Sequence, residues 1–266
     1  MKHFYPVRKL MLVGAAVLSG CAVYVPTVPS TPLLRSKGEV EITGAIRAAT
    51  SLEAGAAWSP ASHLIVTGET ALLKDKGSQT YNNVTTNYHD LHLQGGVGVG
   101  TYRLLGKDKS VYLAALGGIG LATANIHDTH VEDYFYIFPI FSPLVHYRAN
   151  YLRYYGQVYL AKQVRQISFG ASVRNTWLTY SKLRRDGVPI NSPTHFFLEP
   201  TLFMRVGNGA VQGVGTLGVS TPVHMNRQAP NRRNFSPVTT LISLGLVVRP
   251  HLLRHRDPPV MQVPQD

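Results

Sequence analysis

The stretch "YLRYYGQVYLAK" (151–162) decides the fold, because apolar side chains alternate along it with polar and aromatic ones. Successive side chains of a β-strand point to opposite faces, so this stretch predicts a strand with one apolar and one mixed face. The alternation extends over 150–163, longer than the ~5–6 residues usual in soluble sheets. The apolar face carries Leu152, Tyr154, Gly156, Val158 and Leu160, and the mixed face carries Tyr151, Arg153, Tyr155, Gln157 and Tyr159.

The same period of two recurs along most of the chain, which predicts an all-β protein of about ten strands. Apart from the N-terminal residues, no long segment has the 3.6-residue period of a helix. Several of the predicted strands match or exceed the ~9–11 residues of a tilted strand that crosses a membrane. The predicted strands are 39–48, 51–59, 62–73, 88–102, 110–123, 150–163, 165–179, 194–206, 209–220 and 237–248.

The connections between these strands differ in length in a regular way. Short ones, "SPAS", "LLGKDKS", "QVRQ" and "GNG", alternate with long ones at 74–87, 124–149, 180–193 and 221–236. Only the first hairpin, near Thr50, is short where a long one would be expected. Short turns at one end and long external loops at the other are typical of outer-membrane barrels. An even strand count then brings both chain ends to the periplasmic side.

Over residues 39–248 this pattern resembles small bacterial outer-membrane β-barrels of eight to twelve strands. The resemblance implies an antiparallel up-and-down barrel, because a sheet in lipid must close to satisfy its edge groups. The last predicted strand ends at Val247-Val248, whereas such barrels commonly end on an aromatic residue. The alternative is a lipid-tethered soluble barrel, lipocalin-like and ligand-binding, or a sandwich, which would hide its apolar face inside.

The N-terminus has the features of an export signal. Basic residues precede a short apolar run, which is too short to span a membrane, and the run ends in "LSGC" (18–21). This tetrapeptide resembles the lipobox of bacterial lipoproteins, which implies cleavage of a signal peptide (1–20) and acylation of Cys21. Several acyl chains anchor a protein stably. We therefore expect export and lipid anchoring in the cell outer membrane through Cys21.

The two segments that flank the predicted barrel are expected to lack regular structure. In the lipidated N-terminus (21–38), "YVPTVPSTPLLRSKG" (24–38) is Pro-rich and predicts an extended tether. The basic tail (249–266) is expected to be disordered in the periplasm. Cys21 is the only cysteine, so the chain has no intramolecular disulfide.

Charged residues on the mixed strand faces predict a polar lumen. Because unpaired buried charge is costly, residues of both signs should pair across the interior and plug it. A narrow pore for small polar solutes is the alternative, although ten strands leave little open width. The predicted lumen network comprises Glu41, Arg47, Glu69, His92, Arg153, Arg174, Glu199 and Arg205, with Glu53, Gln94 and Gln157 on the same faces.

The chain carries a formal charge of +12, and part of this charge gathers in the predicted outer loops. For a protein located in the outer membrane, this positive charge does not indicate binding of nucleic acid. Guanidinium groups are, however, well suited to bind phosphate groups. Outer-membrane lipid, with lipopolysaccharide phosphates, is the expected partner, and simple solvated charge is the alternative. The candidate anion-binding residues are Lys182, Arg184, Arg185, Arg227, Arg232 and Arg233.

Two further segments have a composition that bears on chemistry or partner binding. "NIHDTHVED" (125–133) is rich in His and acidic residues, but no helix places them on one face, so we expect a solvated loop and no metal site. The apolar segment 134–147 is expected to pack on the barrel rim, at the membrane interface or on a partner. We expect no cofactor and no catalytic activity, and therefore a structural, interaction or narrow-channel role. A lipid-modifying barrel enzyme using His92 or His195 is the competing hypothesis.

Overall fold

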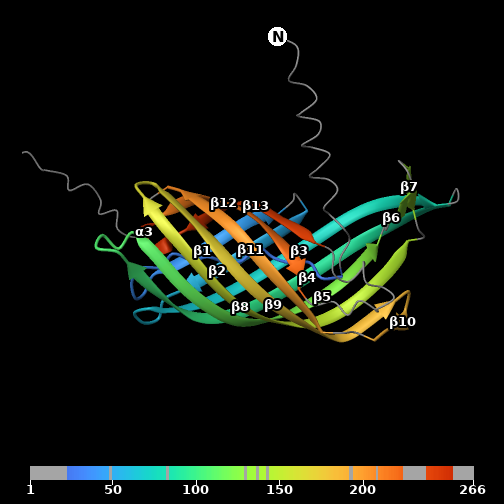
Figure 1. The fold of residues 1–266 in the computed structure, drawn as a ribbon, viewed down its shortest axis with the longest axis horizontal. Coiled ribbons are helices and arrows are strands. Elements are labelled where there is room, and N and C mark those ends of the chain that lie inside the picture. Colours follow the sequence, from blue (N-terminus) through green and yellow to red (C-terminus); the bar gives the residue numbers. More distant parts are fainter. Residues whose placement is uncertain are drawn as a thin grey trace, which may run out of the picture.

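The computed structural model describes residues 23–47, 50–81, 84–128, 131–135, 138–141, 144–191, 194–207, 209–223 and 238–253 (Figure 1). The predicted signal peptide, Cys21 and residues 254–266 of the tail lie outside the described residues. Among the described residues, no helix is long and apolar enough to cross a membrane. The strands are β1 (Val40–Arg47), β2 (Ser51–Trp58), β3 (Leu64–Tyr81), β4 (Val84–Leu105), β5 (Val111–Asp128), β6 (Val131–Phe135), β7 (Phe138–Phe141), β8 (Val145–Val164), β9 (Ile167–Arg185), β10 (Val188–Pro189), β11 (His195–Val206), β12 (Val211–Pro222) and β13 (Thr239–Val248), and the helix is α3 (Pro250–Leu253).

Ten strands form a closed antiparallel barrel, which confirms the predicted fold class. Each strand pairs with the next along the chain, except that β6, β7 and β10 stand outside this order. The barrel closes where β1 pairs with β13, from Ile42 opposite Val248 to Arg47 opposite Ser243. Each wall strand therefore pairs with a neighbour on both sides, and the sheet has no open edge strand, as a sheet in lipid requires.

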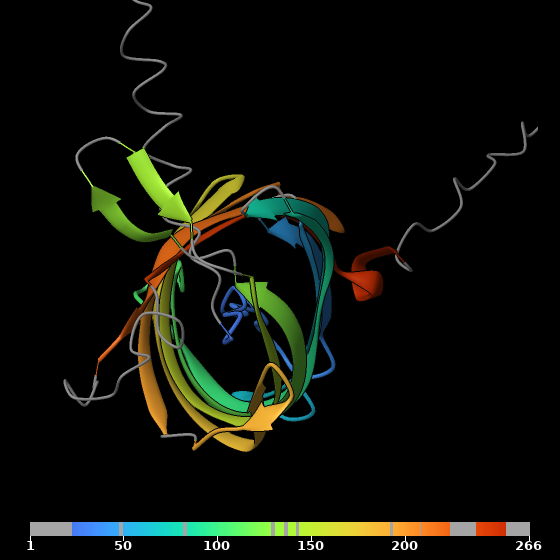
Figure 2. The same ribbon diagram turned by 90° about the vertical axis from the view of Figure 1, so that its right-hand side faces the viewer.

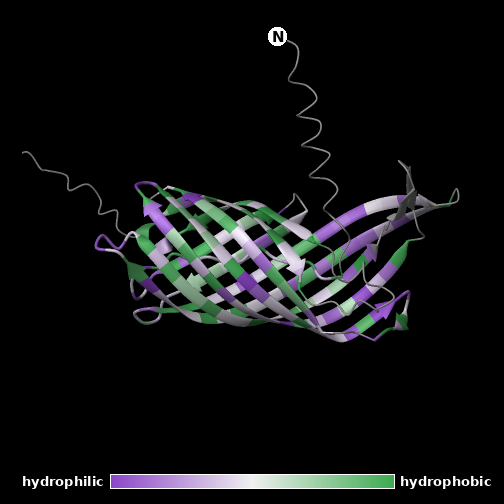
Figure 3. Ribbon diagram, in the orientation of Figure 1, coloured by the Kyte–Doolittle hydropathy of each residue, from purple (hydrophilic) through white to green (hydrophobic). Residues whose placement is uncertain are grey.

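Hydropathy alternates along the strands (Figure 3), because outward-facing side chains are mostly apolar and many inward-facing ones are polar. Leu244, Leu121 and Leu202 point outward and are 73%, 67% and 61% exposed. Their inward-pointing neighbours Ser243 and Thr201 are buried. Large exposed apolar surface of this kind marks contact with a membrane or partner. The barrel is therefore of the outer-membrane type, and its apolar face is not hidden inside as in a lipocalin.

Several strands are longer than the sequence predicts. The predicted loop 74–87 is largely a hairpin, because β3 and β4 stay in register as far as Tyr81 opposite Val84. The strands β5, β8 and β9 likewise extend into the predicted loops 124–149 and 180–193. The β3–β4 extension is largely polar, whereas the extensions of β5, β8 and β9 place apolar residues such as Ile126, Tyr147 and Leu183 inside the barrel. Antiparallel pairing continues through all of these extensions. The apolar segment 134–147 contributes to β6, to the start of β8 and to β7, and β6 pairs with β7.

The two ends of the barrel differ. The short-turn end holds the turns at 59–63, 106–110 and 165–166, the connection from β11 to β12, and α3. The opposite end, here called the long-loop end, holds the extended hairpins, β6, β7 and β10 (Figure 1). Both Val40 and Val248 lie at the short-turn end, because the number of wall strands is even.

The N-terminal segment runs through the inside of the barrel (Figure 2). Val23 and Tyr24 pack at the long-loop end with Ala124 and Tyr147. Leu33 and Leu34 pack at the short-turn end, in a cluster with residues that flank the turn after β4. The predicted tether is thus extended, but it does not lead away from the barrel. Val23, the first described residue, and Val40, the start of the first wall strand, consequently lie at opposite ends of the barrel. This differs from the expectation that the N-terminal and C-terminal parts of the chain lie at the same end.

Candidate functional site: a lumen filled by the N-terminal segment

The lumen is filled by residues 24–35, here called the plug segment. All members of the predicted lumen network point inward, and each is buried or nearly so, with Glu69 the least covered at 11% side-chain exposure. The alternation of each strand explains this placement, because every second side chain faces the interior. The acidic and basic members meet in ion pairs, and each pair also contacts the plug segment.

The pair nearest the long-loop end is Arg174 with Glu199. These residues are direct cross-strand neighbours on β9 and β11, and Arg174 Nε lies 2.5 Å from Glu199 Oε2. The hydroxyl of Tyr24 donates to Glu199 Oε1 over 2.8 Å. Thr176 and Ser220 each donate to the same carboxylate over 3.0 Å. Both carboxylate oxygens of Glu199 therefore have hydrogen-bond donors from the protein. Glu199 fixes the part of the plug segment that lies toward the long-loop end.

Two arginines hold Thr27 at mid-height. Arg153 Nη1 donates to Thr27 Oγ1 over 2.9 Å, and Arg174 donates to the Thr27 carbonyl oxygen. Arg153 also pairs with Glu69. The ring of Tyr155 lies near both guanidiniums, 5.3 Å from that of Arg153 and 5.8 Å from that of Arg174. These cation–π contacts add to the fixed position of the two cations.

The next residues of the plug segment are contacted from β2 and from β8. Glu53 accepts from Arg47 Nε over 2.9 Å and from the backbone N–H of Val28 over 3.1 Å. Gln157 Nε2 donates to the carbonyl oxygen of Ser30 over 2.7 Å. Extended backbone offers free N–H and C=O groups on both sides. The polar lumen satisfies these groups from several strands at once.

Glu41 closes the network at the short-turn end. Arg205 approaches its carboxylate to 3.1 Å and Arg249 to 2.6 Å. The backbone N–H of Leu33 donates to Glu41 Oε2 over 3.1 Å, and Arg205 donates to the carbonyl oxygen of Thr31. Arg249 was predicted to belong to a disordered tail, but it bridges the end of β13 to the plug segment.

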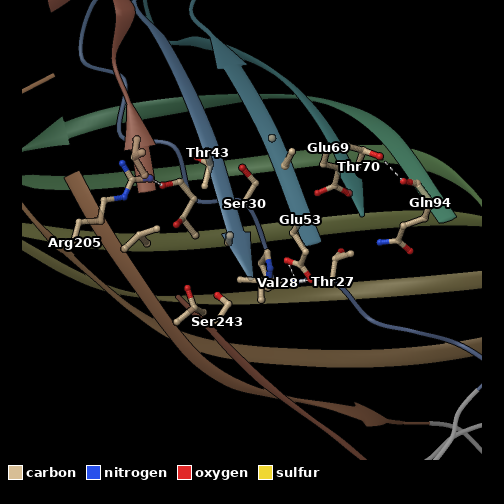
Figure 4. Close-up of a pocket in the computed structure, with 18 of the residues that line it drawn as sticks. Thr27, Val28, Ser30, Thr43, Glu53, Glu69, Thr70, Gln94, Arg205 and Ser243 are labelled. Carbon is tan, nitrogen blue, oxygen red and sulfur yellow. Dashed lines mark hydrogen bonds between the residues drawn. The ribbon is translucent and has the colours of Figure 1, made fainter. Parts of the chain in front are cut away.

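A cavity of about 70 Å³ remains beside the plug segment (Figure 4). Its lining includes Glu53, Glu69, Gln94 and Arg205. Gln94 Oε1 is buried and has no protein partner. A polar cavity of this size accommodates a few water molecules and no larger solute.

The described histidines that are candidates for catalysis or metal binding each contact another side chain of the barrel. His92 is fully buried and its Nε2 lies 2.8 Å from the Tyr151 hydroxyl, while His195 makes an edge contact with Tyr180. His127 Nδ1 lies 2.9 Å from Asp90, and its ring stacks on His146. Within the described ranges, no three His, Cys, Asp or Glu side chains are grouped as a metal site.

The candidate anion-binding residues divide into three groups. Lys182 and Arg184 are exposed on the outer face of β9. Arg185 is half-buried and lies 3.9 Å from Asp186. Arg227, Arg232 and Arg233 lie outside the described residues. Sequence reasoning missed Arg148, which lies beside Arg184 on the neighbouring strand.

Sequence reasoning also missed the plug segment as a component of the site. Its proline content gave a signal for extended backbone, but nothing in the local sequence assigned that backbone to the lumen. Arg249 was missed because it follows the last strand and has the composition of the tail beyond it.

Together the fold and the site define a closed antiparallel β-barrel of the outer-membrane type whose lumen holds its own N-terminal segment. No family model and no curated protein matches the chain. Among solved structures, it is similar to the translocator domain of the autotransporter NalP from Neisseria meningitidis, at 10% identity and a TM-score of 0.42. The alignment covers 91% of this chain and 95% of that one. This likeness concerns the fold alone.

Proposed function

We propose that the protein is an outer-membrane barrel lipoprotein with a structural or interaction role, whose lumen is kept closed by its own plug segment. The observation that supports this proposal is the continuity of the plug contacts. Six residues of the plug segment each form a hydrogen bond with a wall side chain: Tyr24, Thr27, Val28, Ser30, Thr31 and Leu33. Solutes would have to break several charge-assisted hydrogen bonds to pass, and each contributes about 1.5–3 kcal/mol.

Anchoring through Cys21 is part of this proposal, and the plug segment changes its geometry. Consecutive Cα atoms are about 3.8 Å apart, so Cys21 and Val23 are at most about 8 Å apart along the backbone. Val23 packs at the long-loop end. We therefore infer that the lipid anchor is attached to the chain at that end of the barrel. Anchor and barrel would then hold the protein in the membrane together.

Planar-bilayer recording tests the closed state. We expect the wild-type protein to show no steady conductance. A variant in which residues 24–35 are replaced by a Gly/Ser segment of equal length should conduct, because the charged lumen is then hydrated. A gel comparing unheated and boiled samples checks that the variant is folded. Steady conductance of the wild type that changes on replacing Arg153 or Arg174 would instead support the narrow channel.

Membrane insertion and the lipid anchor are tested on carbonate-washed outer-membrane fractions. We expect the unheated protein to migrate as a compact form, and a Cys21→Ala variant to stay in the membrane through its barrel. Release of that variant as soluble protein would contradict the proposal and favour a lipid-tethered soluble barrel. No lipid hydrolysis is expected from either protein. Hydrolysis that disappears in His92→Ala or His195→Ala would support the enzyme hypothesis.

A further inference from the structure

We propose that the outer wall at the long-loop end binds the headgroup phosphate of an anionic membrane lipid through Arg148, Lys182 and Arg184. This inference rests on the proposed membrane location of the barrel. It concerns a surface that plays no part in the plugged lumen.

The three cations share one patch of the outer face. On the paired strands β8 and β9, Arg148 lies opposite Arg184, and Asn150 lies opposite Lys182. Their neighbours in sequence, Tyr147, Ala149 and Leu183, are buried inside the barrel. The three cations are all exposed. They therefore project outward from the wall and not into the mouth of the barrel.

Among the described side chains, none supplies a counter-charge to this patch. Within the part of the chain that the structure describes, none of the three cations forms an ion pair or a side-chain hydrogen bond. The nearest carboxylate in sequence, Asp186, accepts a hydrogen bond from the His146 N–H over 2.9 Å and lies 3.9 Å from Arg185. Like charges directly opposite each other on paired strands are destabilising. A bound anion would convert the Arg148–Arg184 pair from a repulsive contact into a site.

An aromatic cluster places this patch at the edge of the lipid. Tyr154, Trp177 and Phe196 are register neighbours on β8, β9 and β11, and the rings of Trp177 and Phe196 are 4.8 Å apart. Tyr154 and Trp177 are each 44% exposed on the outer face. Outward aromatic side chains of this kind lie at the membrane–water interface.

The cations lie beyond the aromatic cluster on the same outer face. Asn150 and Arg148 lie four and six positions before Tyr154 in the chain, which is toward the long-loop end. With a rise of ~3.3 Å per residue and a tilt near 40°, these positions lie about 10–15 Å further from the membrane centre. Long basic side chains can bend back toward the interface. The three cations therefore reach the layer in which lipid phosphates lie.

The chemistry favours phosphate, and the location favours a lipid. A guanidinium presents parallel N–H donors that match two phosphate oxygens. Two arginines and a lysine together suit a phosphate group with more than one charged or accepting oxygen. The patch continues the lipid-facing wall directly above the apolar belt. A headgroup in the leaflet at the long-loop end is therefore the occupant that the geometry fits.

Thermal unfolding in vesicles of two compositions tests this site. The full-length protein is inserted into phosphatidylcholine vesicles, with or without one-fifth phosphatidylglycerol. We expect the anionic lipid to raise the unfolding midpoint of the wild type by about 5 °C. The double variant Arg148→Gln/Arg184→Gln should gain about 2 °C or less. In phosphatidylcholine alone it should be at least as stable as the wild type, because the repulsion between the two arginines is removed.

Matched controls separate the possible outcomes. The variant Lys107→Gln/Lys109→Gln, in the turn at the other end, should keep the full wild-type gain. A wild-type gain in the Arg148→Gln/Arg184→Gln variant would overturn the proposed site. Inorganic phosphate that reproduces the gain in neutral vesicles would overturn the assignment to a lipid headgroup. If the barrel itself is not in the membrane, a Cys21→Ala variant, which lacks the lipid anchor, will fail to float with either kind of vesicle, and this result is distinct from both.

Discussion

Arg174 and Glu199 face each other across β9 and β11, with Nε and Oε2 2.5 Å apart and neither side chain exposed to solvent. Each also contacts the plug segment, Arg174 at the Thr27 carbonyl oxygen and Glu199 at the Tyr24 hydroxyl. The wall charges therefore neutralise one another and fix the N-terminal segment with the same groups. Stability of the wall and closure of the lumen are consequently coupled.

Removing one member of this pair should strongly destabilise the barrel. We expect Arg174→Met to lower the free energy of unfolding by about 3–5 kcal/mol, because Glu199 is left buried without its cation. The double variant Arg174→Met/Glu199→Met should recover much of this loss. Unfolding in urea, followed by the loss of the compact band of the unheated protein on a gel, measures both changes in the free energy of unfolding. Arg103→Met, an exposed outward-facing change, is the control, and an Arg174→Met midpoint equal to that of the control would contradict the expected coupling.

The Glu41–Arg249 contact predicts a local effect at the short-turn end. Arg249→Leu removes charge-assisted hydrogen bonds worth about 1.5–3 kcal/mol, so the plug segment near Leu33 should open more often. Trypsin cleavage at the exposed Arg35 and Lys37 should then be about 10–100-fold faster, since cleavage follows the open population. Mass spectrometry of timed digests measures the rate. With Arg103→Leu as the control, equal cleavage rates in the two variants would show that Glu41 and Arg249 do not fix the plug segment.

The barrel wall was predictable because its signal is local. A period of two assigns each side chain to a face, so Arg174 and Glu199 could be placed inside the barrel from the sequence. The plug segment was not predictable in this way. Tyr24 and Glu199 are 175 residues apart in the chain, and an extended Pro-rich segment looks the same in solvent as in a polar lumen. The upper parts of β3 and β4 were missed because polar strands beyond the membrane are stabilised by pairing and not by an apolar face.

Glycines beside Tyr155 make a prediction about the inner wall. A Cβ built on Gly118 would overlap the ring of Tyr155, whereas a Cβ on Gly156 would meet open space. Gly118→Val should therefore displace Tyr155 from the two guanidiniums and cost about 1–3 kcal/mol by overpacking. Gly156→Val should leave the free energy of unfolding unchanged or slightly raise it. Urea midpoints of the two variants test this, and equal midpoints would show that the wall adapts to the added side chain.

The depth dependence of an added charge separates a membrane wall from a soluble one. Leu244 lies in the middle of β13 and is 73% exposed, while Val238 precedes the strand at the long-loop end and is 43% exposed. In lipid, Leu244→Lys should cost about 2–4 kcal/mol and Val238→Lys about 0–1 kcal/mol, because only the first places a charge near the bilayer midplane. Reversible unfolding from vesicles gives both values. On a soluble barrel both lysines would simply replace exposed apolar groups, and each change would stay within about 0.5 kcal/mol. Equal small effects would therefore exclude the membrane-embedded wall, whereas a large effect at Leu244 alone would place the middle of β13 in the hydrocarbon layer.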